Sequence, residues 1–259
     1  MTTGVGGDGV HRTATAFSDA AGDYERARPD YPPEILSWLE RHAGVGPRAV
    51  VLDLAAGTGK LTRGLVERGA LVVAVEPVAG MRHAFRAALP GVPAVAGVAQ
   101  ALPVRSGTVD VVTVAQAFHW FATETAVRDV HRVLRRAGHL AVVWNRRDLG
   151  DPLQAALGRL MSPWRGSTPS HESGAWRRAL EQGVGAELFA PEAEAHVPWR
   201  QLLDVEGVVA RVASVSFVAA LAAPERARLL DDVRAAAGAF PPPPALPYVA
   251  DAYCYRRIP

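Results

Sequence analysis

The chain has 259 residues, and its composition excludes several classes of protein before any motif is considered. Apolar residues make up 49% of the chain, which is enough for the core of one large domain or of a domain with an insertion. The formal net charge is only +2 and the basic residues are scattered, so we expect no nucleic-acid partner. The single cysteine, Cys254, excludes an internal disulfide, and the absence of a secretory signal predicts a cytoplasmic protein without membrane contact.

Taken in chain order, strand-like and helix-like segments alternate over the first 145 residues. Residues 1–15 are glycine-rich without an apolar period and predict a disordered tail, and a helix is expected over 17–28. The expected strands then cover residues 49–54, 71–76, 93–96, 109–114 and 138–145. The expected helices cover residues 33–42, 59–68, 78–88 and 123–135. This alternation predicts an α/β fold in which helices cover both faces of a parallel sheet.

Residues 147–192 interrupt the alternation with one expected helix, 151–161, and a segment rich in Gly, Ser and Pro. The segment carries three bulky aromatic residues, Trp164, Trp176 and Phe189. Two interpretations remain open: the aromatic side chains wall a substrate beneath a lid, or they pack a cap against the core.

The last third of the chain predicts two more strands, over 193–200 and 248–257, and two helices between them, over 202–213 and 224–237. The most apolar stretch, Val208 to Ala223, is interrupted by Arg211, Ser214 and Ser216 and is too short to cross a bilayer, which takes about 20 residues. We therefore divide the chain into a tail (1–15), a cofactor-binding core with an N-terminal helical segment (16–146), an inserted cap (147–192) and a completion of the sheet (193–259).

The first expected strand ends in a glycine turn with the sequence DLAAGTG, residues 53–59. Glycine has no Cβ, so the backbone of such a turn can approach a ligand closely. The second strand ends in Glu76, whose carboxylate can accept two hydrogen bonds from a ribose diol. Thr62 stands where the dinucleotide fingerprint has its third glycine, and Lys60 does not fit a P-loop. These residues predict a pocket for an adenosine-containing cofactor without phosphate ligands.

The order Asp-x-x-x-Gly-x-Gly, with an acid at the end of the next strand, resembles the first motif of class I S-adenosylmethionine-dependent methyltransferases. Later motifs are similar in the same order: EPVAGM (76–81), GVAQALP (97–103), DVVTVAQA (110–117) and VLRRAGHL (133–140). Within the methyltransferase type 11 family, YERARPDYP (24–32) and AFHWF (117–121) look like the subgroup of trans-aconitate methyltransferase. The resemblance covers residues 17–146 and implies a Rossmann-like fold, with a mostly parallel seven-stranded sheet and a C-terminal antiparallel strand.

The resemblance also implies the cofactor, S-adenosyl-L-methionine, and its product, S-adenosyl-L-homocysteine. By resemblance Glu76 holds the ribose, Met81 packs near the adenine, and Arg28 either pairs with the cofactor carboxylate or forms a surface salt bridge. Asp53 either orients the glycine loop or meets the methionine amino group. Many relatives have an acid where this chain has Val98, so Gln100 or backbone groups would receive the adenine amine. The expected cofactor contacts are Tyr24, Arg28, Asp53, Ala55, Gly57, Thr58, Gly59, Glu76, Pro77, Met81, Ala99, Gln100, Ala115 and Gln116.

Methyl transfer from a sulfonium needs orientation, worth roughly 7–11 kcal/mol, and needs a base only when the acceptor holds its proton. His119 is the candidate base, unless it only orients its loop through the backbone. The expected substrate contacts are His119, Trp120 and Trp144. No metal is expected, because His171-Glu172 has no second ligand pair at a recognisable spacing.

We therefore predict an enzyme, a monomer or homodimer, that methylates a small molecule in specialised metabolism. Oxygen of a carboxylate or hydroxyl is the expected acceptor, ahead of nitrogen. Two alternatives stay open: a cyclisation or rearrangement in which the cofactor is a structural ligand, and a non-catalytic cofactor-binding partner protein. An NAD-dependent oxidoreductase is a weaker third alternative.

Overall fold

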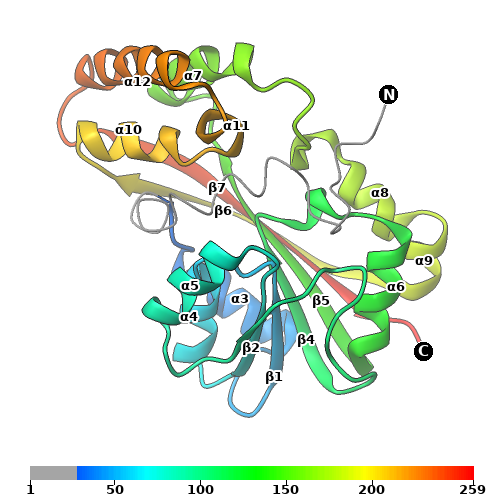
Figure 1. Ribbon diagram of the computed structural model, residues 1–259. Helices are drawn as coiled ribbons and strands as arrows, with labels where there is room; N and C mark the ends of the chain where they lie inside the picture. Colours follow the sequence, from blue (N-terminus) through cyan, green and yellow to red (C-terminus); the bar gives the residue numbers. More distant parts are fainter. Residues whose placement is uncertain (1–27) are drawn as a thin grey trace.

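The computed structural model describes residues 28–259, and in these residues seven strands form one sheet (Figure 1). The strands are β1 Val50–Leu54, β2 Leu71–Val75, β3 Ala94–Val95, β4 Val109–Ala115, β5 Leu134–Arg147, β6 Phe189–Leu202 and β7 Ala245–Arg257. Their order across the sheet is β3-β2-β1-β4-β5-β7-β6, and strands β1 to β5 pair in parallel. Strand β7 runs antiparallel to both β5 and β6. The predicted fold, a mostly parallel seven-stranded sheet with a C-terminal antiparallel strand, is confirmed. The expected tail, Tyr24 and nearly all of the helix expected over 17–28 lie outside the described residues.

The helices lie on both faces of the sheet and beyond one of its ends. They are α3 Pro33–Ala43, α4 Lys60–Glu67, α5 Ala79–Ala88, α6 Glu124–Val133, α7 Pro152–Met161, α8 Ala175–Glu181, α9 Val184–Leu188, α10 Val205–Ala213, α11 Ser216–Ala219 and α12 Ala223–Gly238. Three short 3-10 turns join them: η1 Phe118–Trp120, η2 Ser162–Trp164 and η3 His171–Ser173.

The strands divide the core into two layers because successive side chains point to opposite faces of a sheet. Val51 of β1 packs with Leu39 of α3 and Leu65 of α4. Leu52 and Leu54 of the same strand face the other way, into the cluster formed by α6, α8 and strands β4 and β5. This layered packing fixes the carboxyl ends of β1, β2, β4 and β5 at one edge of the sheet, where the motif loops follow.

The β6–β7 pair is longer than the sequence pattern predicts. Its pairing runs from Phe189 opposite Arg257 to Leu202 opposite Ala245, whereas a strand over 193–200 was expected. Strand β6 lies at the sheet edge, and most of its residues alternate between half-buried and exposed. Because no apolar run marks where this strand begins or ends, the sequence does not show its full length. The edge position also accommodates Pro191 and Pro198, which cannot donate to a ladder.

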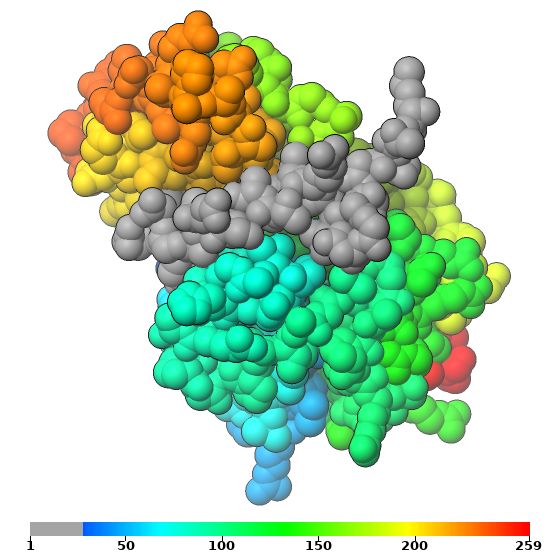
Figure 2. Space-filling model, viewed as in Figure 1, coloured from blue at the N-terminus to red at the C-terminus, as the bar shows by residue number. Residues whose placement is uncertain are grey.

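The long β6–β7 pair carries a separate helical lobe, which we define as α7, α10, α11 and α12. Its core joins Leu157 of α7, Val212 of α10 and Val233 of α12 to Leu246 and Tyr248 of β7. The lobe therefore combines a segment after β5 with the whole segment between β6 and β7. Figure 2 shows the lobe, in orange and yellow, as a mass above the cyan and green α/β core.

The aromatic residues of 147–192 pack into cores. Trp176 is 5% exposed and Phe189 is 1% exposed, and both belong to the cluster around β4 and β5. Trp164 packs against the core of the helical lobe. The packing interpretation of these three residues is thus the one that the structure shows. None of the helices in residues 28–259 combines the length and the apolar character that a membrane crossing requires.

Candidate functional site

A cavity of about 340 Å³ lies between the carboxyl ends of the central strands and the helical lobe. Ligand sites of open α/β sheets occur at this edge, next to the point where the strand order reverses, which here is between β1 and β4. We call its two ends the cofactor half and the lobe half. The cofactor half is lined by Leu54, Ala55, Gly57, Glu76, Pro77, Val78, Met81, Gly97, Val98, Ala99, Gln100, Ala115 and Gln116.

Glu76 follows β2 and lies at the floor of the cofactor half with 5% of its surface exposed. Its Oε2 accepts a hydrogen bond of 3.0 Å from the backbone N–H of Gly57, and its Oε1 accepts one of 2.8 Å from Val78. Burial raises the pKa of the Glu76 carboxyl, against the effect of these two backbone donors. Each oxygen keeps a further lone pair, so a ribose diol can donate to the carboxylate.

The glycine loop between β1 and α4 holds its shape through left-handed backbone conformations. Gly57 has φ 58° and Gly59 has φ 92°, and α4 begins at the next residue, Lys60. Two non-glycine residues at the ends of neighbouring strands also have left-handed backbone conformations: Ala55 with φ 56° and Gln116 with φ 61°. Such conformations cluster at ligand sites, where the surrounding structure enforces them. Here the backbone N–H of Ala55 donates to Val75, and that of Gln116 donates to Val143.

Asp53 lies beneath the glycine loop rather than in the cavity. It is 1% exposed, and its two oxygens accept hydrogen bonds from Thr62 Oγ1 of α4 at 2.5 Å and Thr113 Oγ1 of β4 at 2.9 Å. These contacts join β1 to the next helix and the next strand of the sheet. The sequence leaves two roles open for Asp53, and these contacts support the one in which it orients the glycine loop. Burial raises the pKa of Asp53 to about 6, although both threonine hydrogen bonds lower it.

Replacing Asp53 with asparagine is expected to remove a pH dependence of the free energy of unfolding. Because the pKa is raised in the folded protein, this contribution to stability is fully present below pH 3.8 and is lost as the pH rises through about 6. Between about pH 5 and pH 7.5 the free energy of unfolding of the parent should fall by roughly 1–2 kcal/mol relative to the variant, because one pKa unit corresponds to about 1.4 kcal/mol. Urea unfolding of parent and Asp53→Asn proteins at both pH values measures it. A parent-minus-variant difference that does not change with pH would contradict the burial argument.

His119 lies in η1, the turn that follows β4, and it lines the cavity where the two halves meet. Trp144 Nε1 donates a hydrogen bond of 3.3 Å to His119 Nδ1. Since an indole N–H only donates, Nδ1 is the acceptor and the neutral ring carries its proton on Nε2. Burial lowers the pKa of His119 to about 3, and the neighbouring His171 and Arg165 add to this effect. His119 is therefore a neutral hydrogen-bond donor in this arrangement.

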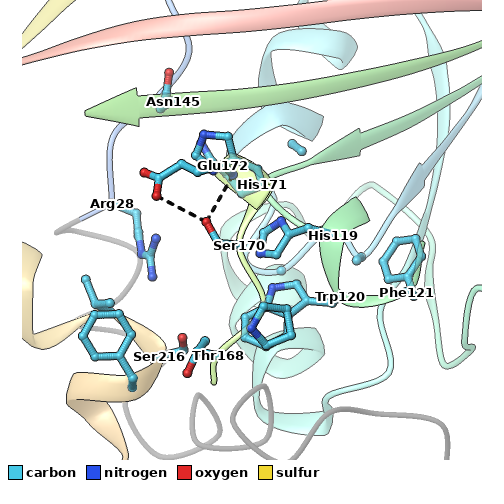
Figure 3. Close-up of a pocket in the computed structure, with 18 of the residues that line it drawn as sticks. Arg28, His119, Trp120, Phe121, Asn145, Thr168, Ser170, His171, Glu172 and Ser216 are labelled. Carbon is cyan, nitrogen blue, oxygen red and sulfur yellow. Dashed lines mark hydrogen bonds between the residues drawn. The ribbon is translucent and has the colours of Figure 1, made fainter. Parts of the chain in front are cut away.

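The structure brings most of the predicted site residues together around one cavity. Arg28 lines both the cavity and a smaller pocket beside the glycine loop, and its Nη2 donates to the backbone oxygen of Ser214 at 2.6 Å. Trp120 and Phe121 wall the cavity next to His119, across from Arg28 (Figure 3). The other predicted cofactor contacts that line the cavity all lie in the cofactor half: Ala55, Gly57, Glu76, Pro77, Met81, Ala99, Gln100, Ala115 and Gln116.

Three further predicted residues do not line the cavity that the described residues form. Thr58 lines only the small pocket beside the glycine loop. Gly59 packs against Phe85 of α5 and against Leu89, which follows the end of that helix. Trp144 is 1% exposed and lies behind His119, with its ring 4.4 Å from that of Trp176. A contact between Trp144 and a substrate stays a prediction, and the observed contacts with cavity residues are those to His119 and His171.

The lobe half consists almost entirely of residues that the sequence reasoning did not select. They come from β5, α7, the loop through η3, α10, α11 and β7, and include Arg147, Gln154, Leu157, Met161, Arg165, His171, Glu172, Arg211, Val212, Ser216, Phe217 and Tyr248. One signal was present in the sequence: Arg211 and Ser216 interrupt an apolar stretch, and both are buried in the structure. Figure 3 shows Ser170, His171 and Glu172 between Arg28 and His119.

Among the described residues, three potential metal ligands lie within 4.8 Å of one another: His139, Glu192 and Cys254. His139 Nε2 lies 3.0 Å from Glu192 Oε2, while the Cys254 thiol donates to the backbone oxygen of His42 and has its pKa raised to about 12 by burial. None of the three lines the cavity. The expected absence of a metal stays a prediction.

The strand order, the carboxylate after β2 and the glycine loop after β1 together define a Rossmann-like protein with a nucleoside-cofactor site. Comparison with known proteins agrees. A family described as a methyltransferase domain matches residues 52–142. An uncharacterized methyltransferase of Mycobacterium tuberculosis is 41% identical over 219 residues, 85% of this chain and 84% of that protein. The chain belongs to the class I S-adenosylmethionine-dependent methyltransferases. Its place in the trans-aconitate subgroup stays a prediction.

Solved structures show the same fold. A type II methyltransferase from Anaeromyxobacter dehalogenans has a TM-score of 0.63 and 26% identity, covering 88% of this chain and 97% of that one. The geranyl diphosphate C-methyltransferase of Streptomyces coelicolor, solved with Mg²⁺, geranyl diphosphate and S-adenosyl-L-homocysteine, has a TM-score of 0.50 and 12% identity. It covers 87% of this chain and 79% of that one, a likeness in fold.

Proposed function

We propose that this methyltransferase transfers the methyl group of S-adenosylmethionine to an oxygen of a small molecule bound in the lobe half. The observation that carries the proposal is the continuity of the cavity, in which one space is lined both by Glu76 and by residues of the helical lobe. A cofactor whose ribose meets Glu76 therefore shares one cavity with an acceptor held under the lobe. A cavity of this size suits a small molecule rather than a macromolecule.

The residues of the cofactor half fit an adenosine-containing group without phosphate. A buried carboxylate receives the ribose, Met81 and Val98 offer apolar surface, and a Cβ built on Gly57 meets nothing within 4 Å, so that its backbone is open to the cavity. When bound, the sulfonium supplies an activated methyl group that leaves a neutral thioether. The protein's own part is then to orient the acceptor and to exclude water.

The polar groups near His119 favour an acceptor that needs no strong base. His119 is neutral and its Nδ1 is engaged by Trp144, so it offers an N–H to the acceptor. His171 also lines the cavity, its pKa is lowered by burial, and its Nε2 is buried without a hydrogen-bond partner among the described residues. A carboxylate oxygen is nucleophilic without loss of a proton, and it accepts hydrogen bonds from such donors. Oxygen acceptors in specialised metabolism are therefore our first choice, and nitrogen acceptors come second.

A product analysis tests the proposal. The protein is incubated with S-adenosylmethionine that carries an isotopic label in its methyl group, together with sets of organic acids, phenols, alcohols and amines. We expect labelled methyl esters or ethers and an equal amount of S-adenosylhomocysteine by mass spectrometry. Labelled N-methyl products would show that the acceptor atom is nitrogen and not oxygen. Conversion of a substrate while the label stays on the cofactor would overturn the proposal in favour of a cyclisation or rearrangement.

The pH dependence of turnover is expected to contain no histidine titration. Since the pKa of His119 is lowered to about 3, the ring is neutral over the range from about pH 5 to pH 9. His119→Ala should lower kcat by less than about 100-fold, because it removes one hydrogen bond rather than a base. Initial rates across this pH range, at saturating cofactor, provide the measurement. A tenfold fall in kcat per pH unit below about pH 6.5, absent in His119→Ala, would identify His119 as the base instead.

A further inference from the structure

The lobe half of the cavity gathers cationic side chains from separate elements. Arg147 ends β5, Arg165 follows η2, and Arg211 lies in α10. Arg165 has a carboxylate partner, because its Nη1 and Nη2 both lie 3.0 Å from Glu172 Oε2. The charges of Arg147 and Arg211 have no carboxylate within ion-pair distance among the described residues.

Arg147 is the cation with the least compensation. It lines the cavity, its Nη1 is buried, and that atom has no hydrogen-bond partner among the described residues. A Cβ built on Gly158 of α7 would lie 3.9 Å from the same Nη1, so α7 covers this atom from one side. Burial lowers the pKa of Arg147, the nearby Arg211 adds to the effect, and the Glu172 carboxylate opposes it from beyond ion-pair distance. A buried guanidinium without an acceptor is costly unless a ligand pairs with it.

Within residues 28–259, the groups that hold Arg211 in place are neutral. It is 9% exposed, its Nε donates to Tyr248 Oη at 3.1 Å, and its Nη1 lies 3.5 Å from Ser214 Oγ. Its guanidinium carbon also lies 5.9 Å from the centre of the Tyr248 ring. These contacts hold the side chain, and none of the groups that make them carries a negative charge. Because planar guanidinium groups suit carboxylates, Arg147 and Arg211 at one cavity wall offer hydrogen bonds that an organic anion could accept.

We propose that the lobe half binds a carboxylate of the acceptor substrate through Arg147, with Arg211 beside it. The wall around these arginines is apolar, with Leu157, Met161, Val212 and Phe217 among its residues, so the acid has an apolar body. This inference rests on the proposed function, since it names the class of acceptor for the same cavity. The arginines recognise the substrate through one carboxylate. The methylated oxygen is the acceptor oxygen near His119 that is proposed above.

A binding series tests the proposal with the protein saturated by S-adenosylhomocysteine. The probes are octanoate, octanol and octyl phosphate, which share one apolar chain and differ in the head group. The proteins are the parent, Arg147→Gln, Arg147→Lys and the control Arg159→Gln. Arg159 is an exposed arginine of α7 that does not line the cavity. Calorimetry gives the affinity for each probe, and a separate titration gives the affinity for S-adenosylhomocysteine.

We expect the parent to bind octanoate at least about tenfold more tightly than octanol, as suits a charge-assisted hydrogen bond. Arg147→Gln should lose most of that preference, Arg147→Lys should keep part of it, and Arg159→Gln should keep it all. A phosphate preferred over the carboxylate, an unchanged preference in Arg147→Gln, or no binding of octanoate would overturn the proposal. If S-adenosylhomocysteine itself fails to bind the parent, the proposed function fails and not only this inference.

Discussion

Glu76→Ala is expected to weaken the binding of S-adenosylmethionine and S-adenosylhomocysteine by about a hundredfold to ten-thousandfold. The Glu76 carboxylate is buried at the end of β2 and lines the cavity beside Gly57. Hydrogen bonds to charged groups contribute about 1.5–3 kcal/mol each, and a ribose diol makes two of them. Their combined loss, about 3–6 kcal/mol, corresponds to the stated range of affinity. Calorimetric titration with S-adenosylhomocysteine measures it without any need for an acceptor substrate.

The fold of the variant and the chemistry of the carboxylate need separate controls. Glu67→Ala removes an exposed acid from the end of α4 and should leave the affinity unchanged. Glu76→Gln should be nearly as weak as Glu76→Ala, because the N–H groups of Gly57 and Val78 donate to different oxygens of Glu76. A glutamine amide would place its own donor against one of them. A folded Glu76→Ala protein with the parent's affinity would refute the assignment of the cofactor site.

The cofactor half was predictable from the sequence because it depends on strand ends alone. Once β1, β2 and β4 are parallel and adjacent, the residues after them must meet at one edge of the sheet. Glu76 and Gln116 directly follow β2 and β4, and Gly57 lies in the turn after β1, so the alternation places all three at this edge, while the resemblance to the family names Gln116 as a cofactor contact.

The position of Trp144 shows what strand periodicity can add to the prediction of a site. Trp144 is predicted from the sequence to contact substrate. Its side chain shares a sheet face with Leu140 and Val142, four and two residues earlier, and that face packs in the core with α6 and α8. The alternation along β5 therefore predicts a buried ring. Trp144 contacts residues of the site through the hydrogen bond from its Nε1 to His119 and through its ring, which stacks on His171 with 5.8 Å between the ring centroids.

The lobe half was not predictable, because nothing local in the sequence joins its parts. Arg147 and Arg211 lie 64 positions apart in the chain, and the lobe that unites them forms only when α7 packs against α10, α12 and β7. A single polar residue within an apolar helix fits a surface or a cavity equally well from sequence. Only the tertiary contacts show that Arg211 is buried and lies against Tyr248. Substrate specificity therefore depends on the part of the chain without motifs.

The two glycines of the loop are expected to fail in different ways when they are replaced. A Cβ on Gly59 would lie 2.7 Å from Leu89 Cδ1 and 3.0 Å from two ring atoms of Phe85, and φ is 92°. Phe85 is fully buried and anchors α5, the helix that carries Met81. Left-handed strain costs about 1–2 kcal/mol and overpacking about 1–3 kcal/mol, so Gly59→Val should lose roughly 2–5 kcal/mol of stability. For a chain of this size that lowers Tm by about 5–15 °C, which thermal unfolding measures.

Gly57→Ala should instead stay folded and lose affinity for the cofactor. No atom of residues 28–259 lies within 4 Å of a Cβ at Gly57, so the expected cost is the strain at φ 58°, about 1–2 kcal/mol. The new methyl group would occupy the cavity wall beside Glu76, where the ribose is expected, so binding of S-adenosylhomocysteine should fall about tenfold or more. Thermal unfolding and calorimetry on both variants separate the two effects. The reverse pattern, in which Gly57→Ala unfolds and Gly59→Val is stable but loses the cofactor, would show that Gly59 and not Gly57 faces the ligand.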